Sequence, residues 1–243
     1  MPTRMYSVVI DTADLAAQAR FWSEGTGWPI TYDMDDEKVV EPPDGEPGIP
    51  LVFVRVGDPK VGKNRIHLDL NARSEEHQAT WVQRLTAAGA SPADVGQQDV
   101  PWVVLADPEG NELCVLDPRD DYAQAGPVAA VVVDAPEPAR LAGFWAAASG
   151  WDVLATDERY ATLAAPGGAG PRLELIRVED PKVGKNRWHL DVAPAAGDDQ
   201  AAEVARLTAL GATDADVGQG PDCTWVVLAD PDGNEFCVLS PRD

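Results

Sequence analysis

The sequence of 243 residues has no long apolar run, and it has only three cysteines, three histidines and three methionines. A membrane-spanning helix needs about 18 or more consecutive apolar residues, so this absence predicts a protein without membrane contact. An odd number of cysteines does not make a complete disulfide framework. The N-terminus lacks the apolar segment of a secretion signal, so we expect a cytoplasmic protein.

Basic residues are also scarce, because 41 Asp and Glu stand against 19 Lys and Arg and give a formal net charge of −22. Acids outnumber bases in both halves of the chain. An acidic surface repels phosphate backbones and anionic lipid, which excludes nucleic acid and membranes as expected partners. Solubility is a sufficient explanation for this charge. The hydrophobic fraction of 44% is that of an ordinary globular protein.

The dominant feature of the sequence is an internal repeat. The octapeptide DPKVGKNR occurs at residues 58–65 and 180–187, and His-Leu-Asp follows each copy after one intervening residue. The closing segments WVVLADPEGNELCVLDPRD and WVVLADPDGNEFCVLSPRD match at the same offset of 122 or 123 residues. A period of this length is typical of a duplicated domain rather than of a solenoid. We therefore predict two tandem domains, at residues 1–121 and 127–243, joined by a short polar linker.

Each repeat divides again into two similar modules. In the first repeat, residues 8–11 and 49–56 are typical of strands, and residues 14–24 carry apolar residues at helical spacing. After the octapeptide the order starts again, with a strand at 67–70, a helix at 74–88 and a hairpin closed by the turn DPEGN. The pattern predicts an α+β fold built from four strand–helix–strands modules.

The paired modules, the KNR-x-HLD segments and the closing DPEGN and DPDGN hairpins resemble the glyoxalase/bleomycin resistance/extradiol dioxygenase superfamily, also named the vicinal oxygen chelate superfamily. The resemblance is to its glyoxalase-like branch and covers nearly the whole chain twice. It implies tandem glyoxalase-like domains, each with two βαβββ modules that form a cupped mixed sheet with helices outside. In the enzymes of this superfamily the cup holds a divalent metal at four ligand places, whereas its antibiotic-resistance members sequester a small molecule.

Carried over onto this sequence, those four places fall at Ser7, Val52, His67 and Cys114 in the first repeat and at Ala130, Glu174, His189 and Cys237 in the second. The first repeat therefore lacks a complete metal site. The second offers Glu174, His189 and Cys237, which would hold Zn²⁺ with a water in the fourth position. In the alternative interpretation Cys114 and Cys237 are small apolar side chains that are buried and only contribute packing. The histidines are then hydrogen-bonded residues at the mouth of each cup, oriented by Asp69 and Asp191.

Four tryptophans at loop–strand junctions are candidates to line a pocket for a flat apolar ligand, namely Trp28, Trp102, Trp151 and Trp225. With His67, His189, Cys114 and Cys237 they form the expected ligand-binding set. The cations of the octapeptide, such as Lys63 and Arg65, either anchor an anionic ligand group or belong to a solvated crossover in which the arginine pairs with an acid. We favour the crossover.

We expect a protein that binds a small, partly apolar organic molecule, with neither a complete metal site nor another cofactor. The alternative is a metal-dependent lyase, isomerase or dioxygenase with a divalent metal in the second domain. A third interpretation is that one cup functions while the other completes the fold. Two repeats in one chain supply the pairing of a homodimer, so we expect a monomer with an internal pseudo-dimer, or else a homodimer.

Overall fold

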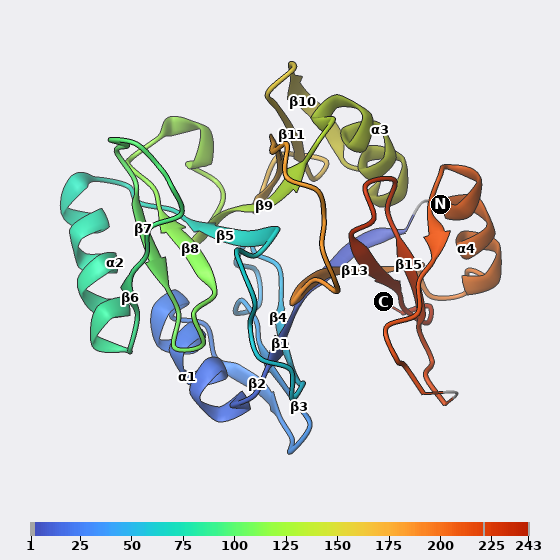
Figure 1. Cartoon of the computed structure of the whole chain (residues 1–243), viewed down its shortest axis with the longest axis horizontal. Coiled ribbons are helices and arrows are strands. Elements are labelled where there is room, and N and C mark those ends of the chain that lie inside the picture. Colours follow the sequence, from blue (N-terminus) through green and yellow to red (C-terminus); the bar gives the residue numbers. More distant parts are fainter. Residues whose placement is uncertain (1–2, 221, 243) are drawn as a thin grey trace.

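The computed structural model describes residues 3–220 and 222–242, which form two eight-stranded mixed sheets (Figure 1). Sheet A has the strand order β14 (Thr213–Asp214), β15 (Val226–Ala229), β16 (Glu235–Val238), β13 (Trp188–Ala193), β1 (Arg4–Thr12), β4 (Leu51–Arg55), β3 (Glu37–Val40) and β2 (Ile30–Asp33). Sheet B has the order β10 (Asp152–Thr156), β11 (Tyr160–Ala164), β12 (Arg172–Arg177), β9 (Val128–Ala135), β5 (Ile66–Leu70), β8 (Glu112–Val115), β7 (Val103–Ala106) and β6 (Ser91–Pro92).

Each sheet combines one module from each half of the chain. In sheet A the first module, β1 to β4, joins the last module, β13 to β16, through antiparallel pairing of β1 with β13. In sheet B the two central modules join through antiparallel pairing of β5 with β9. The predicted α+β fold with tandem glyoxalase-like repeats is confirmed. The exchange of modules means, however, that side chains from different repeats share one sheet.

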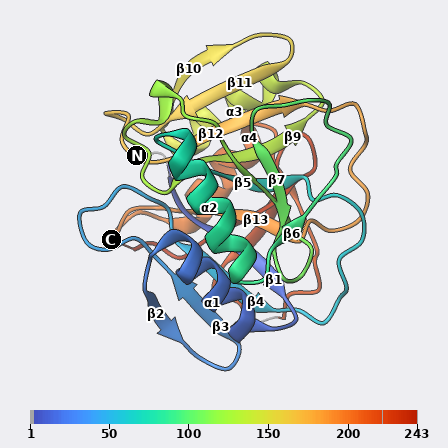
Figure 2. The same cartoon turned by 90° about the vertical axis from the view of Figure 1, so that its left-hand side faces the viewer.

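The helices are α1 (Leu15–Thr26), α2 (Glu75–Ala87), α3 (Pro138–Ser149) and α4 (Gln200–Ala209). Helix α1 begins after Asp14, whose carboxylate accepts a hydrogen bond from the backbone N–H of Ala17. It ends at Gly27, which has a φ of 78°. Figure 2 views the molecule from the end that carries α1 and α2. Among the described residues the longest helix, α2, has 13 residues, and no helix is long and apolar enough to cross a membrane.

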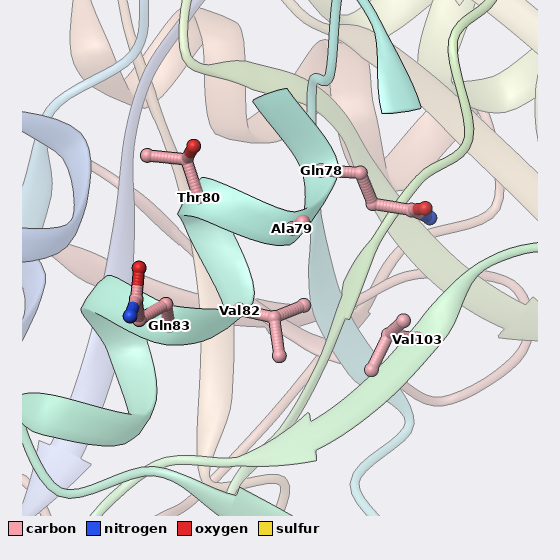
Figure 3. A pocket seen from close by; sticks show the side chains of 6 residues that line it. All are labelled: Gln78, Ala79, Thr80, Val82, Gln83 and Val103. Carbon is pink, nitrogen blue, oxygen red and sulfur yellow. The ribbon is translucent and has the colours of Figure 1, made fainter. Parts of the chain in front are cut away.

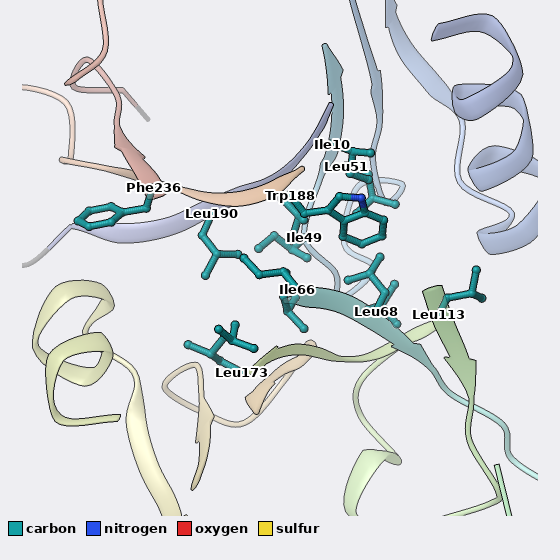
Figure 4. Packing of buried hydrophobic residues seen from close by; sticks show 14 of the residues in the cluster. Ile10, Ile49, Leu51, Ile66, Leu68, Leu113, Leu173, Trp188, Leu190 and Phe236 are labelled. Atoms are coloured by element: carbon teal, nitrogen blue, oxygen red, sulfur yellow. The ribbon is translucent and has the colours of Figure 1, made fainter. Parts of the chain in front are cut away.

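One hydrophobic core lies between the two sheets. Trp188 and Leu190 of sheet A point towards Ile66, Leu68 and Leu173 of sheet B, and all five side chains are buried (Figure 4). Because side chains alternate along a strand, the residues between them face away from the core. Both sheets bend away from the core, so each presents a concave outer face.

Candidate functional site

The predicted histidines and cysteines lie on the concave outer faces of the two sheets, in two separate groups. Cup A is the outer face around β1, β4, β13 and β16, and cup B is the outer face around β9, β12, β5 and β8. On β13 His189 and Asp191 share the outer face, and the parallel strand β16 brings Cys237 opposite Asp191. The same arrangement in cup B brings together His67, Asp69 and Cys114. Each cup therefore contains one His–Asp–Cys trio.

In cup A the three side chains of the trio are in mutual contact. The distance from Cys237 Sγ to His189 Nε2 is 3.4 Å, and that from His189 Nε2 to Asp191 Oδ1 is 3.6 Å. Ser7, which lies on β1, donates a hydrogen bond of 2.8 Å from its hydroxyl to Asp191 Oδ2. The other carboxylate oxygen, Oδ1, is buried and accepts no hydrogen bond from a nitrogen or oxygen donor among the described residues, and the Cys237 thiol is only a weak donor to the carboxylate. It faces the imidazole and the thiol, and a ligand group that donates would satisfy it.

Burial sets the protonation states in cup A. Removal from water lowers the pKa of His189 to about 3, so its imidazole is neutral at physiological pH. Burial raises the pKa of Asp191 to about 7, against the hydrogen bonds from Ser7 and Cys237 that favour the carboxylate. Burial and the neighbouring Asp191 carboxylate raise the pKa of the Cys237 thiol, which stays protonated. The cup thus offers neutral donors and acceptors beside one titrating carboxyl group.

In cup B the trio has a further neighbour, Glu174 on β12. His67 Nε2 lies 3.5 Å from Asp69 Oδ1. Glu174 accepts a hydrogen bond of 2.5 Å from the hydroxyl of Tyr122, which belongs to the linker between the repeats. Burial raises the pKa of Glu174, and burial together with the Glu174 carboxylate raises the pKa of Tyr122. The two cups therefore differ in what surrounds the same three residues.

The predicted zinc set of Glu174, His189 and Cys237 is wrong as a group. Glu174 lies in sheet B, whereas His189 and Cys237 lie in sheet A, because the modules pair across the repeats. The sequence predicts Asp69 and Asp191 only as residues that orient the histidines. Their position two residues after each histidine, on the same face of a strand, is the signal that makes them part of the site.

The donor atoms of each trio have the chemistry and the spacing that suit a metal ion. In both cups the imidazole nitrogen, carboxylate oxygen and thiol sulfur lie within 4.8 Å of one another. Ligand atoms in a tetrahedral zinc site stand roughly 3.3–3.7 Å apart, given bonds of about 2.0–2.3 Å. In cup A the separations of 3.4 and 3.6 Å match this spacing. The residues that would hold the ion there are His189, Asp191 and Cys237.

The four candidate tryptophans have different environments. Trp28 is 1% exposed and belongs to the core, so its predicted place in a ligand pocket is wrong. Its ring packs over Gly48, where a Cβ atom would lie 2.7 Å from the indole. Trp102 packs beside cup B under the guanidinium of Arg119, whose Cζ lies 5.6 Å from the ring centroid. Trp225 is 41% exposed.

Trp151 lines a groove of about 480 Å³ that also includes Arg4 and Tyr6. A second, open hollow of about 590 Å³ lies on α2 and is lined only by uncharged side chains, including Gln78, Thr80 and Val82 (Figure 3). It contains no member of either trio. These hollows therefore lack the His–Asp–Cys trio that is repeated in the two cups, and the cups remain the candidate site.

The two octapeptides meet across a cleft of about 610 Å³, where they bind the halves of the chain to each other. Lys63 Nζ lies 2.6 Å from Asp134 Oδ2, and Lys185 pairs in the same way with Asp11. Arg187 donates to the backbone oxygens of Asp11 and Asp58, each at 2.8 Å. It also pairs with a carboxylate of the first repeat, at 2.7 Å from Glu109 Oε2.

Arg65 makes the reciprocal contacts, to the backbone oxygens of Asp134 at 2.7 Å and Asp180 at 3.0 Å. These cations already have partners in the other half of the chain. The contacts support the crossover interpretation of the octapeptide over that of an anion anchor.

Comparison with known proteins agrees with this architecture. The family model described as the glyoxalase-like domain matches twice, at residues 7–116 and 130–239. The chain belongs to the glyoxalase-like domain family. No curated protein matches the sequence of this glyoxalase-like protein.

Among solved structures, glyoxalase I from Zea mays is similar, with 17% identity, a TM-score of 0.68, and coverage of 98% of this chain and 92% of that chain. A candidate dioxygenase from Bacillus subtilis is similar with 12% identity and a TM-score of 0.65, over 98% of this chain and 85% of that chain. At these identities the similarity shows the fold of the glyoxalase-like protein and not its reaction.

Proposed function

We propose that this glyoxalase-like protein binds a small, partly apolar organic molecule on the concave face of cup A. The observation that carries the proposal is an aliphatic surface directly beside the buried polar trio. Val52 of β4 pairs with Val9 of β1, and Val9 pairs with His189 of β13, so the three residues form one row across the sheet. Such a row suits a ligand with an apolar body and one polar end.

The polar end of the ligand would meet Asp191 and His189. The buried Asp191 Oδ1 accepts a hydrogen bond from a hydroxyl, amide or protonated acid, and the neutral His189 imidazole offers a second polar contact. Val52 stands at one of the four ligand places that the superfamily resemblance implies, and a valine side chain cannot bind a metal. The cup therefore supports binding by hydrogen bonds and apolar contact in preference to a complete four-ligand metal site.

The proposal is tested by NMR of protein with ¹³C-labelled histidine, since three histidines give three assignable imidazole signals. A set of small aromatic and branched aliphatic alcohols, amides and acids is added in the presence of EDTA. We expect at least one probe to shift the His189 signal while His77, on the outside of α2, stays unchanged. The substitution Val52→Glu, which copies the residue of cup B, should weaken that binding, and His77→Gln should not. If none of these probes shifts the His189 signal, the proposal is contradicted.

A second candidate is a metal-dependent lyase, isomerase or dioxygenase, and the donor spacing in the trio favours it. His189, Asp191 and Cys237 would hold a zinc ion and leave a position for a substrate oxygen. The bound metal would supply Lewis-acid activation of that oxygen. Ser7 would keep the Asp191 carboxylate oriented, as it does through its hydrogen bond to Oδ2. Zinc added to chelator-treated protein should then shift the His189 signal, and Cys237→Ser should abolish the shift.

We also propose that the chain is a monomer with an internal pseudo-dimer. The pairing of β1 with β13 and of β5 with β9, which joins modules of different halves, supports this state because both contacts form within one chain. Light scattering during size exclusion should give the mass of one chain, 25.9 kDa. A mass twice as large would favour the homodimer.

A further inference from the structure

The linker between the two repeats enters cup B. After β8 the chain forms the short 3-10 helix η1 (Asp120–Tyr122) and returns to the sheet at β9. The Tyr122 side chain is 6% exposed. It shares a small apolar cluster with Leu116, Ala125 and Ala129, against which Trp102 and the trio's Cys114 pack. The linker was predicted as a short polar connection, and its one aromatic side chain lies instead on the concave face.

The Tyr122 side chain extends across cup B, and its hydroxyl reaches strand β12. It donates to Glu174 Oε1 on β12 at 2.5 Å, and the carboxylates of both Glu174 and Asp69 act on its ionisation. The phenol thus has an apolar ring against small side chains and one polar contact at its far end. This is the mode in which a small-molecule pocket holds a phenol.

The linker is fixed on both of its sides, so Tyr122 belongs to the folded structure of cup B. The buried Asn71 side chain donates to the backbone oxygens of Tyr122 at 2.9 Å and Gly126 at 3.0 Å. On the other side Arg172 donates to the backbone oxygen of Asp121 at 3.3 Å. These contacts come from β12 and from the end of β5, which are the walls of the same cup.

Cup A differs at the two positions that receive this phenol. By strand register, Val52 takes the place of Glu174, so no carboxylate is available to accept from a hydroxyl there. Tyr6 takes the place of Ala129 at the bulge of the central strand, where the small alanine leaves room for the ring of Tyr122. The phenol-binding features are thus specific to cup B.

We propose that cup B is a phenol-binding site whose resident ligand is the protein's own Tyr122. The side chain occupies the place of an external ligand, so cup B binds none until that side chain is removed. The inference rests on the proposed function in one respect, because it takes the concave face of the sheet as the ligand-binding face. It follows that a wild-type chain binds external ligand at cup A alone.

The test removes the resident phenol and supplies a free one. The substitution Tyr122→Gly leaves a space with the outline of p-cresol, which is the tyrosine side chain as a molecule. We expect this variant to bind p-cresol at least about tenfold more tightly than the wild type, with a shift of the His67 imidazole signal. Tyr122→Phe keeps the ring in place and should bind no more p-cresol than the wild type. Adding Glu174→Leu to Tyr122→Gly should reverse the preference, from p-cresol to toluene.

A folded Tyr122→Gly variant that binds p-cresol no better than the wild type overturns the inference. A second measurement covers the case in which this variant does not fold. In NMR of the wild type, nuclear Overhauser contacts from the Tyr122 ring to the side chains of Leu116 and Ala129 report directly whether the phenol lies in cup B. We expect both contacts, because the three side chains belong to one buried cluster. Absence of both contacts in the folded wild type would overturn the inference as well.

The two proposals fail in different experiments. If no probe shifts the His189 signal of the wild type, the proposed function of cup A fails. A shift of the His67 signal when p-cresol binds Tyr122→Gly would still support the resident-ligand inference in that case. If the wild type binds a probe in cup A but the folded Tyr122→Gly variant gains nothing, only the inference about cup B fails.

Discussion

Asp191→Asn should change how the stability of the protein depends on pH. Burial holds the pKa of Asp191 at about 7 in the folded protein, against an ordinary value of 3.8 in the unfolded chain. A carboxyl group with a raised folded pKa binds its proton more tightly in the folded state, so its contribution to stability is lost as the pH rises from about 4 through about 7. A shift of about three units corresponds to about 4 kcal/mol.

Asparagine has nearly the same shape and keeps an oxygen that can accept from Ser7, but it does not ionise. We therefore expect the Asp191→Asn variant to gain up to about 4 kcal/mol in unfolding free energy relative to the wild type between about pH 4 and about pH 8. Urea unfolding followed by tryptophan fluorescence, at several pH values and with EDTA present, measures this difference. Asp152→Asn, at an exposed position on β10, is the matched control and should follow the wild-type profile.

Parallel profiles of wild type and Asp191→Asn, within about 0.5 kcal/mol, the usual spread of surface substitutions, would refute a raised pKa of Asp191 in the folded protein. Asp191 would then ionise as an exposed carboxyl group does. A profile in which Asp191→Asn loses stability at high pH would also refute it, because that sign requires a carboxylate that is favoured by folding.

Four further substitutions test the architecture by urea unfolding. Arg187→Ala removes the contacts of one octapeptide to the other half and should cost about 2–3 kcal/mol, with the loss of the half-buried pair with Glu109 as the main cause. Trp28→Ala should cost about 3–5 kcal/mol because the ring is in the core. Trp225→Ala, at a position 41% exposed, should cost less than about 1 kcal/mol. Gly126→Ala should cost more than about 1 kcal/mol, since φ is 76° and a Cβ atom would lie 2.5 Å from a backbone oxygen. Equal losses for the two tryptophans would contradict the core position of Trp28.

The repeat, the modules and the contact between each histidine and its aspartate follow from the sequence. These features depend on local periodicity, and the alternation of a strand is enough to put His67 beside Asp69. The exchange of modules between sheets could not be predicted in this way. The segments Ile66–Asp69 and Trp188–Asp191 are near copies, so pairing β1 with either one satisfies the same hydrophobic pattern. The metal grouping with Glu174 failed for that reason.

The predictions for Trp28, as a pocket residue, and for Tyr122, as part of a polar linker, were wrong for a different reason. In each case a small residue elsewhere in the fold makes space for the aromatic ring. The indole of Trp28 enters the core because Gly48 has no Cβ atom in its way. Tyr122 enters cup B because Ala129 stands where cup A has Tyr6. Gly48 is 20 residues after Trp28 and Ala129 is seven residues after Tyr122, and in neither case do the two residues share a helix or strand whose pattern would connect them. A lone tyrosine in a polar linker was the one available signal.

We propose that the His–Asp–Cys trio of cup A serves a ligand-binding face without a resident metal. Elemental analysis of the protein purified without chelator measures this metal content. We expect less than about 0.1 equivalent of any transition metal per chain, and no further loss in Asp191→Asn or Cys237→Ser. About one equivalent of zinc or another divalent metal, lost in both variants, would instead establish the trio as a metal site.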